Sequence, residues 1–92
     1  MRENAYRTVY KIMLIYPVQT VDLPVGAVVV NVATQNGVPC MWVEVEPAAP
    51  SEKRTFAGYG TGHSIEPGYV YVGTAHDVEG MGLVFHIYEK KS

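Results

Sequence analysis

The segment of this sequence best suited to hold a ligand is Gly60-Thr61-Gly62-His63-Ser64. Two glycines one residue apart let the backbone approach a ligand closely and expose consecutive N–H groups. Thr61 and Ser64 add hydroxyl groups, and the imidazole of His63 adds a donor that can carry positive charge. These groups together suit a phosphate. The competing interpretation is a tight irregular loop in which the glycines only turn the chain.

Aromatic and basic side chains elsewhere suit the other parts of a nucleotide. Arg54 lies two residues before Phe56, so both side chains point to the same face of one strand. An arginine beside an aromatic ring can hold a phosphate, and Trp42 or Phe56 offers a ring on which a base can stack. Two alternatives stay open: Trp42 as a core residue, and Arg54 as a surface residue paired with Glu44 or Glu52.

The nucleophiles and bases of the sequence form no known catalytic arrangement. None lies in a G-x-S-x-G or H-E-x-x-H motif, and the histidines lack the short spacing of metal ligands. We expect Cys40 to be a small buried residue and His86 to be a half-buried strand residue hydrogen-bonded to a neighbour. We therefore predict a protein that is not an enzyme and holds no cofactor or metal. An enzyme with His63 as general base is the least favoured alternative. The candidate nucleophiles are Cys40, Ser51, Ser64 and several threonines, and the candidate bases are His63, His76 and His86.

The composition indicates one small globular domain, residues 1–92, that shares part of its surface with a partner. Hydrophobic residues make up 48% of the chain, and charged residues make up only 17%, below the roughly 25% of a typical domain. Apolar surface must then stay exposed unless another molecule covers it, so we expect a symmetric homo-oligomer. The formal net charge of −2 disfavours a protein that coats duplex nucleic acid.

The single cysteine, Cys40, excludes an internal disulfide framework and points to the reducing cytoplasm. The N-terminal segment lacks the apolar centre of a signal peptide. No apolar run is long enough for a transmembrane helix, so we expect no membrane partner.

The elements that position these residues are predicted to be strands throughout. Nine glycines and six prolines leave no uninterrupted stretch for a long helix. We expect an all-β fold, a small antiparallel β-sandwich or open barrel of about seven strands. The strand over 27–33 is apolar at nearly every position and is predicted to be buried on both faces. The predicted strands span Ala5–Tyr16, Val18–Leu23, Ala27–Ala33, Cys40–Glu46, Arg54–Tyr59, Tyr69–Ala75 and Leu83–Tyr88.

The connections between these strands carry their own signals. Asn36-Gly37 between two β-prone runs predicts a type I′ hairpin, because both central residues tolerate a positive φ. Two prolines, Pro47 and Pro50, predict an extended loop. The residues from 60 to 68 form the longest loop, and those from 76 to 80 form an acidic one.

Six segments in a fixed order resemble a widespread family of short phage proteins. The family pattern includes Q-N-G-x-P-x-x-W, R-T-F and G-T-G-H-x-I, and the resemblance covers the chain from about Val9 to Glu89. Ser64 stands where the family more often has proline. The segments are Asp22–Ala27, Gln35–Trp42, Glu52–Phe56, Gly60–Ile65, Tyr71–Thr74 and Leu83–His86.

Small phage proteins of this size include sponges, which bind and hide the nucleotide messengers of bacterial immunity. The resemblance therefore implies an anti-defence protein that sequesters a cyclic oligonucleotide, without cleaving it, in the cytoplasm of an infected bacterium. The alternative is a β-sandwich interaction module that binds a host or virion protein through an exposed edge or apolar patch. The predicted ligand-binding residues are Trp42, Arg54, Phe56, Thr61, Gly62, His63 and Ser64.

Overall fold

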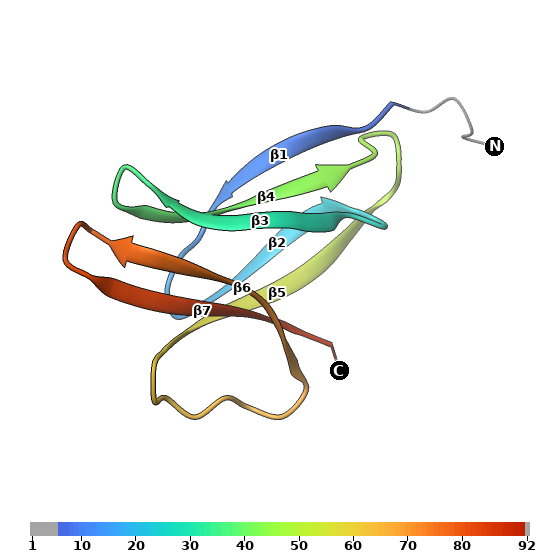
Figure 1. The fold of residues 1–92 in the computed structure, drawn as a ribbon. Coiled ribbons are helices and arrows are strands. Elements are labelled where there is room, and N and C mark those ends of the chain that lie inside the picture. Colours follow the sequence, from blue (N-terminus) through green and yellow to red (C-terminus); the bar gives the residue numbers. More distant parts are fainter. Residues whose placement is uncertain (1–5, 92) are drawn as a thin grey trace.

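The computed structural model describes residues 6–91, which form two antiparallel β-sheets packed face to face (Figure 1). The three-stranded sheet has the order β1-β4-β3, and the four-stranded sheet has the order β2-β5-β7-β6. The predicted all-β sandwich is confirmed, and the sheets do not close into a barrel. The strands are β1 (Thr8–Met13), β2 (Val18–Pro24), β3 (Val28–Gln35), β4 (Val38–Val45), β5 (Ser51–Gly60), β6 (Tyr69–Val78) and β7 (Leu83–Lys90).

The core lies between the two sheets and follows from the alternation of side chains along β4. Met41, Val43 and Val45 occupy every second position of this central strand, so all three point inward and are buried. Phe56 of β5 and Ile87 of β7 meet them from the four-stranded sheet. Burying a side chain of this size contributes about 1.5–3 kcal/mol to folding.

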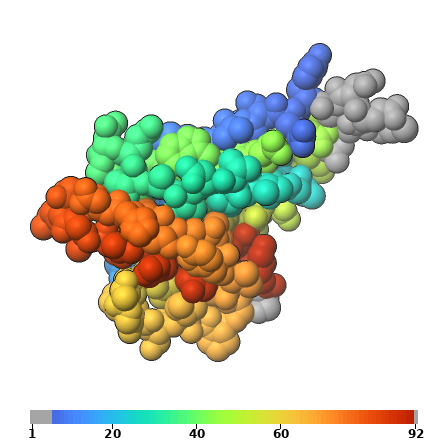
Figure 2. Space-filling model, in the orientation of Figure 1, coloured from blue at the N-terminus to red at the C-terminus, as the bar shows by residue number. Residues whose placement is uncertain are grey.

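Two edge strands, β3 and β6, lie against each other where the sheets meet. Figure 2 shows β3 in teal directly above β6 in orange. A Cβ atom added at Gly73 of β6 would lie 2.7 Å from the Cβ of Val32 in β3. The absence of a side chain at Gly73 is what allows this close contact.

The prediction that residues 27–33 form a strand buried on both faces is wrong. β3 is an edge strand, and Val28 and Val30 are 55% and 54% exposed. A continuous apolar run indicates a buried strand only where both faces of its sheet are covered. In the described part of the chain, nothing covers the outer face of the three-stranded sheet.

Some strand boundaries also differ from the prediction. β1 begins at Thr8 rather than Ala5, which lies outside the described residues, and ends at Met13 rather than Tyr16. β6 continues to Val78, through part of the predicted acidic loop. Asp77, whose φ is +54°, lies at a register shift in the β6–β7 pairing.

The predicted hairpin at Asn36-Gly37 is present. Its central residues have φ values of +52° and +80°, and Gln35 pairs with Val38 across it. The N–H of Glu79 donates to the carbonyl oxygen of Gly37 at 2.7 Å. This bond ties the β3–β4 hairpin to the β6–β7 turn beside it.

The connection from residue 61 to 68 lies outside the four-stranded sheet. β5 and β6 are both antiparallel to β7, so they run in the same direction and their connection has to return along the sheet. Figure 1 shows this connection, yellow to light orange, below the sheet. The predicted phosphate-binding loop is therefore placed beside the outer face of β5, β7 and β6.

Candidate functional site

The outer face of the four-stranded sheet carries a cluster of tyrosines, here called the tyrosine face (Tyr59, Tyr69, Tyr71 and Tyr88, with His86). Strand register brings them together, because Tyr71 pairs with Tyr88 and Tyr59 pairs with His86. The rings meet edge to face, with centroids 5.5 Å apart for both Tyr59–Tyr88 and Tyr71–Tyr88. Such aromatic contacts each add about 0.5–1.5 kcal/mol beyond burial and fix the ring orientations.

A chain of hydrogen bonds crosses this face. The Oγ1 of Thr61 lies 2.8 Å from Nε2 of His86, and the Oγ1 of Thr74 lies 3.2 Å from Nδ1 of the same ring. The Oη of Tyr71 lies 2.6 Å from Thr74 Oγ1. The prediction that His86 is a half-buried strand residue bonded to a neighbour is confirmed. The contact with Thr61 also fastens the 61–68 connection to the sheet.

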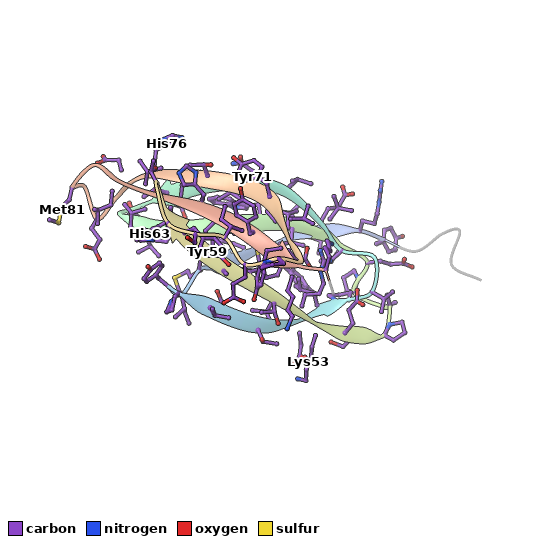
Figure 3. All side chains as sticks on the ribbon, turned by 90° about the horizontal axis from the view of Figure 1, so that it is seen from below. Lys53, Tyr59, His63, Tyr71, His76 and Met81 are labelled. Carbon is purple, nitrogen blue, oxygen red and sulfur yellow. The ribbon has the colours of Figure 1, made fainter. Side chains whose placement is uncertain are left out.

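The tyrosine face is most open to solvent at its β6 edge. Tyr71 is 54% exposed, whereas Tyr59 and Tyr88 are half-buried. In the view of Figure 3, from below the molecule, Tyr59, His63 and Tyr71 lie towards the same part of the sheet, and Lys53 lies apart from them. A ligand in solution can therefore reach the ring of Tyr71 and the neighbouring hydroxyl groups.

Some donors of the loop expected to bind phosphate are already hydrogen-bonded within the loop. The N–H of His63 donates to the carbonyl oxygen of Gly60 at 3.1 Å, and the N–H of Gly60 donates to Nδ1 of His63 at 3.2 Å. The imidazole of His63 thus folds back over Gly60. Gly62 and Ser64 are exposed. Gly62 has a φ of +91°, and a Cβ atom added there would meet no atom within 4 Å.

Arg54 is held by a carboxylate at one end of the sandwich. Its Nε and Nη2 donate to the two oxygens of Glu89 at 2.5 and 2.8 Å, and Nη1 donates to the carbonyl oxygen of Ala27 at 2.6 Å. The side chains are 15% and 5% exposed. The alternative in which Arg54 is a surface residue paired with Glu44 or Glu52 is wrong. The strand register pairs Glu89 with Phe56, two residues from Arg54, and Arg54 bonds Glu89 instead.

The pKa shifts of this pair favour the charged forms. Burial alone would raise the pKa of Glu89, but hydrogen bonds from Arg54 and Lys91 outweigh burial and hold that pKa below its ordinary value. The hydrogen bond to Glu89 raises the pKa of Arg54, against the opposing effect of burial. The pair is therefore a fixed ionic contact.

Neither of the two predicted stacking residues lies on the tyrosine face. Phe56 is 2% exposed and lies in the core, with the Arg54 guanidinium 5.8 Å from its ring centroid. Its ring has no face open to a base. Trp42 is half-buried on the outer face of the three-stranded sheet, between Lys11 and Asn31.

The seven predicted site residues therefore fall in three places. Thr61, Gly62, His63 and Ser64 lie beside the tyrosine face. Arg54 is half-buried at one end of the sandwich, and Phe56 lies in the core next to it. Trp42 lies on the opposite side of the sandwich. The sequence prediction missed the tyrosines. Their period of two, as in Tyr69 and Tyr71, was a usable signal, but the partner strands were not known.

Two kinds of site are not found in the described residues. Between residues 6 and 91, no three histidine, cysteine, aspartate or glutamate side chains are grouped as metal ligands would be. The same residues contain no helix long and apolar enough to cross a membrane.

The family model described as Domain of unknown function (DUF7352) matches residues 5–92. The chain belongs to this family. All seven strands fall within the matched residues, so the two-sheet sandwich and the tyrosine face are both parts of this domain. No curated protein and no solved structure matches the chain.

Proposed function

We propose that this protein binds a cyclic nucleotide messenger on the tyrosine face and sequesters it without cleaving it. The observation that carries the proposal is the exposed ring of Tyr71 next to the hydrogen-bonded groups of Thr74, His86 and Thr61. An aromatic surface accepts a base by stacking, and adjacent hydroxyl and imidazole groups offer directional hydrogen bonds. Gly62 and Ser64 are exposed in the same loop as Thr61, whose hydroxyl contacts His86.

The same contacts favour binding over hydrolysis. Thr61 and His86 lie within hydrogen-bond reach, as a nucleophile and its base would. The other imidazole nitrogen, however, meets the neutral hydroxyl of Thr74 rather than a carboxylate. An imidazolium formed by proton transfer would then have no negative charge to stabilise it, unlike the histidine of a catalytic triad.

The biological setting of the proposal comes from the resemblance to short phage proteins. A protein that holds an immune messenger in the cytoplasm of an infected bacterium needs tight binding and no turnover. The tyrosine face supplies groups for binding, and the Thr61–His86 contact lacks the carboxylate of a triad.

Calorimetric titration with a panel of cyclic di- and trinucleotides tests the proposal. We expect at least one member to bind at micromolar concentration and to be recovered intact by chromatography. Tyr71→Ala should weaken that binding about tenfold or more, because base stacking contributes roughly 1–3 kcal/mol. Tyr10→Ala is the matched control, since Tyr10 is a partly exposed tyrosine of the other sheet.

The nucleotide proposal fails if no member of the panel binds the wild-type protein. Recovery of a linear product would instead make the protein an enzyme. An equal loss of affinity in Tyr10→Ala and Tyr71→Ala would move the site away from the tyrosine face.

A second candidate function is a protein-interaction module, and one observation favours it. The outer face of the three-stranded sheet, here called the Trp42 face, exposes apolar side chains around a half-buried tryptophan. Exposed apolar surface of this kind indicates a partner, and a second copy of the chain is the simplest one.

Light scattering should then show a dimer or larger oligomer, and Val28→Glu should dissociate it. A wild-type monomer at micromolar concentration would contradict self-association. The apolar residues of the Trp42 face are Val9, Met13, Val28 and Trp42.

A further inference from the structure

A shallow depression of about 420 Å³ lies at the end of the four-stranded sheet where β5 begins and β7 ends. Its volume falls within the roughly 300–1,000 Å³ of small-molecule sites. We call it the charged trough, because six of its seven lining residues are ionic. They are Glu52, Lys53, Arg54, Thr55, Glu89, Lys90 and Lys91.

The trough concentrates positive charge in a chain that is negative overall. It contains four basic and two acidic residues, although the whole chain has only seven lysines and arginines and a formal net charge of −2. These four cations come from two short segments, 53–54 and 90–91, that lie on neighbouring strands. A local field of this sign raises the concentration of small anions at the trough.

The ion pairs inside the trough leave its positive charge incompletely balanced. Glu89 is contacted by two cations, Arg54 at 2.5 Å and Lys91 at 3.2 Å. Lys53 pairs with Asp22 at 3.1 Å, but both side chains are largely exposed, and such a pair is weak. Lys90 has no ion pair with any residue between 6 and 91.

The buried arginine gives the trough a rigid wall. Three hydrogen bonds to Glu89 and Ala27 fix the guanidinium of Arg54, so its charge cannot move away from the trough. The three lysines around it are exposed and flexible at their ends, so they can close on an anion from several directions. A fixed guanidinium with mobile ammonium groups suits the tetrahedral oxygens of a phosphate.

We infer that the charged trough binds a phosphate group, either as a free inorganic anion or as part of a nucleotide. The inference rests on the charge and shape of the trough and does not depend on the proposed function. The two surfaces do adjoin, because Lys90 pairs with Tyr69, next to the Tyr71–Tyr88 pair on the same face. A nucleotide with its base on the tyrosine face would thus have its phosphate close to Lys90.

The test is an NMR titration of the ¹⁵N-labelled full chain with inorganic phosphate, pyrophosphate and adenosine diphosphate. We expect amide shifts confined to residues 51–55 and 89–91, and weaker binding at high salt because screening reduces the attraction. Lys91→Gln and Lys53→Gln should each weaken pyrophosphate binding about threefold to fivefold, as expected for exposed charges. Lys11→Gln, which removes a cation of the other sheet, should change nothing. These lysines are exposed, so the variants should fold.

Three results would overturn the inference: no shift at millimolar pyrophosphate, shifts scattered over the surface, or an equal effect of Lys11→Gln. If adenosine diphosphate binds more tightly than pyrophosphate and also shifts residues 69–71, the phosphate group is that of a nucleotide. If both bind alike, the site serves a free anion. Binding of pyrophosphate without any cyclic nucleotide binding would support the trough and contradict the proposed function.

Discussion

The two outer faces of this sandwich differ in what they can recognise. On the tyrosine face, three aromatic contacts and a chain of hydrogen bonds through Thr74, His86 and Thr61 fix the polar groups. On the Trp42 face, the indole lies between Lys11 and Asn31, and the exposed valine and methionine side chains have no such hydrogen-bonded chain among them. Polar contacts on this face join Lys11 to Gln35 and Arg7 to Glu44.

The difference indicates two kinds of binding. Hydrogen bonds with fixed directions discriminate between ligands, because a mismatched ligand leaves polar groups unpaired. Exposed valine and methionine side chains offer apolar contact area but no directional hydrogen bonds. Such a surface suits a larger protein partner or a second copy of the chain. We therefore propose that this small domain has a ligand-selective face on one sheet and a less selective protein-binding face on the other.

Both faces are held in place by the interior of the sandwich. The largest expected effect on stability comes from removing the Arg54–Glu89 ion pair. Glu89→Gln should lower the free energy of unfolding by about 3–5 kcal/mol, because it leaves Arg54 buried without its counter-ion. Urea denaturation measures this loss. Glu52→Gln, an exposed substitution next to the same arginine, is the control and should change stability by less than about 0.5 kcal/mol. Equal effects of the two substitutions would show that the pair is not structural.

The second largest effect on stability is expected at Gly37, where the β3–β4 hairpin contacts the β6–β7 turn. Gly37→Val should cost about 1–3 kcal/mol, because Gly37 has a φ of +80°. Gly26→Val provides the comparison, since its φ is +86° but a Cβ there meets no atom within 4 Å, whereas at Gly37 it lies 3.3 Å from Glu79 Cα. Thermal unfolding should rank Gly37→Val as the less stable variant. The reverse order would mean that the hairpin can move away from the β6–β7 turn.

Stability should also depend on pH through the same buried pair. The pKa of Glu89 is lower in the folded protein than its ordinary value of 4.5. Its stabilisation is therefore complete above that value and is lost as the pH falls through the folded pKa. Urea midpoints measured at decreasing pH should fall below about pH 4.5. Glu89→Gln should show a smaller decline, and an identical decline in both proteins would assign the acid sensitivity to other carboxylates.

The smallest expected effect distinguishes the ring of Tyr71 from its hydroxyl group. Tyr71→Phe keeps the stacking surface and removes the hydrogen bond to Thr74. Ligand affinity should fall only about fivefold, since a neutral hydrogen bond contributes roughly 0.5–1.5 kcal/mol. Trp42→Ala should leave that affinity unchanged. If Tyr71→Phe is as damaging as Tyr71→Ala in calorimetry, the hydroxyl rather than the ring carries the binding.

The strands and the hairpin could be predicted from the sequence because their signals are local. Alternation in residues 40–46 and the Asn36-Gly37 turn depend on neighbours in the chain, and both appear where expected. The pairing of the sheets depends on distant residues. Arg54 and Glu89 are 35 positions apart, so no local pattern identified this partner.

The loop of the candidate site could be predicted from the sequence, but the grouping of the tyrosines and the histidine beside it could not. Glycine spacing singles out Thr61 and His63 as candidates, but Thr61 bonds His86, which is 25 positions away and has no local signal for this contact. Phe56 was misplaced for a related reason. Sharing a strand face with Arg54 does not show whether that face points to solvent or to the other sheet, and here it points inward.

We place the ligand of this protein on the tyrosine face. The most direct measurement is an amide shift map of the wild-type protein with the tightest-binding cyclic nucleotide of the panel. This placement predicts that the largest shifts occur in residues 59–63, 69–74 and 86–88. Largest shifts in β1, β3 and β4, around Trp42, would contradict it, as would the absence of any shift.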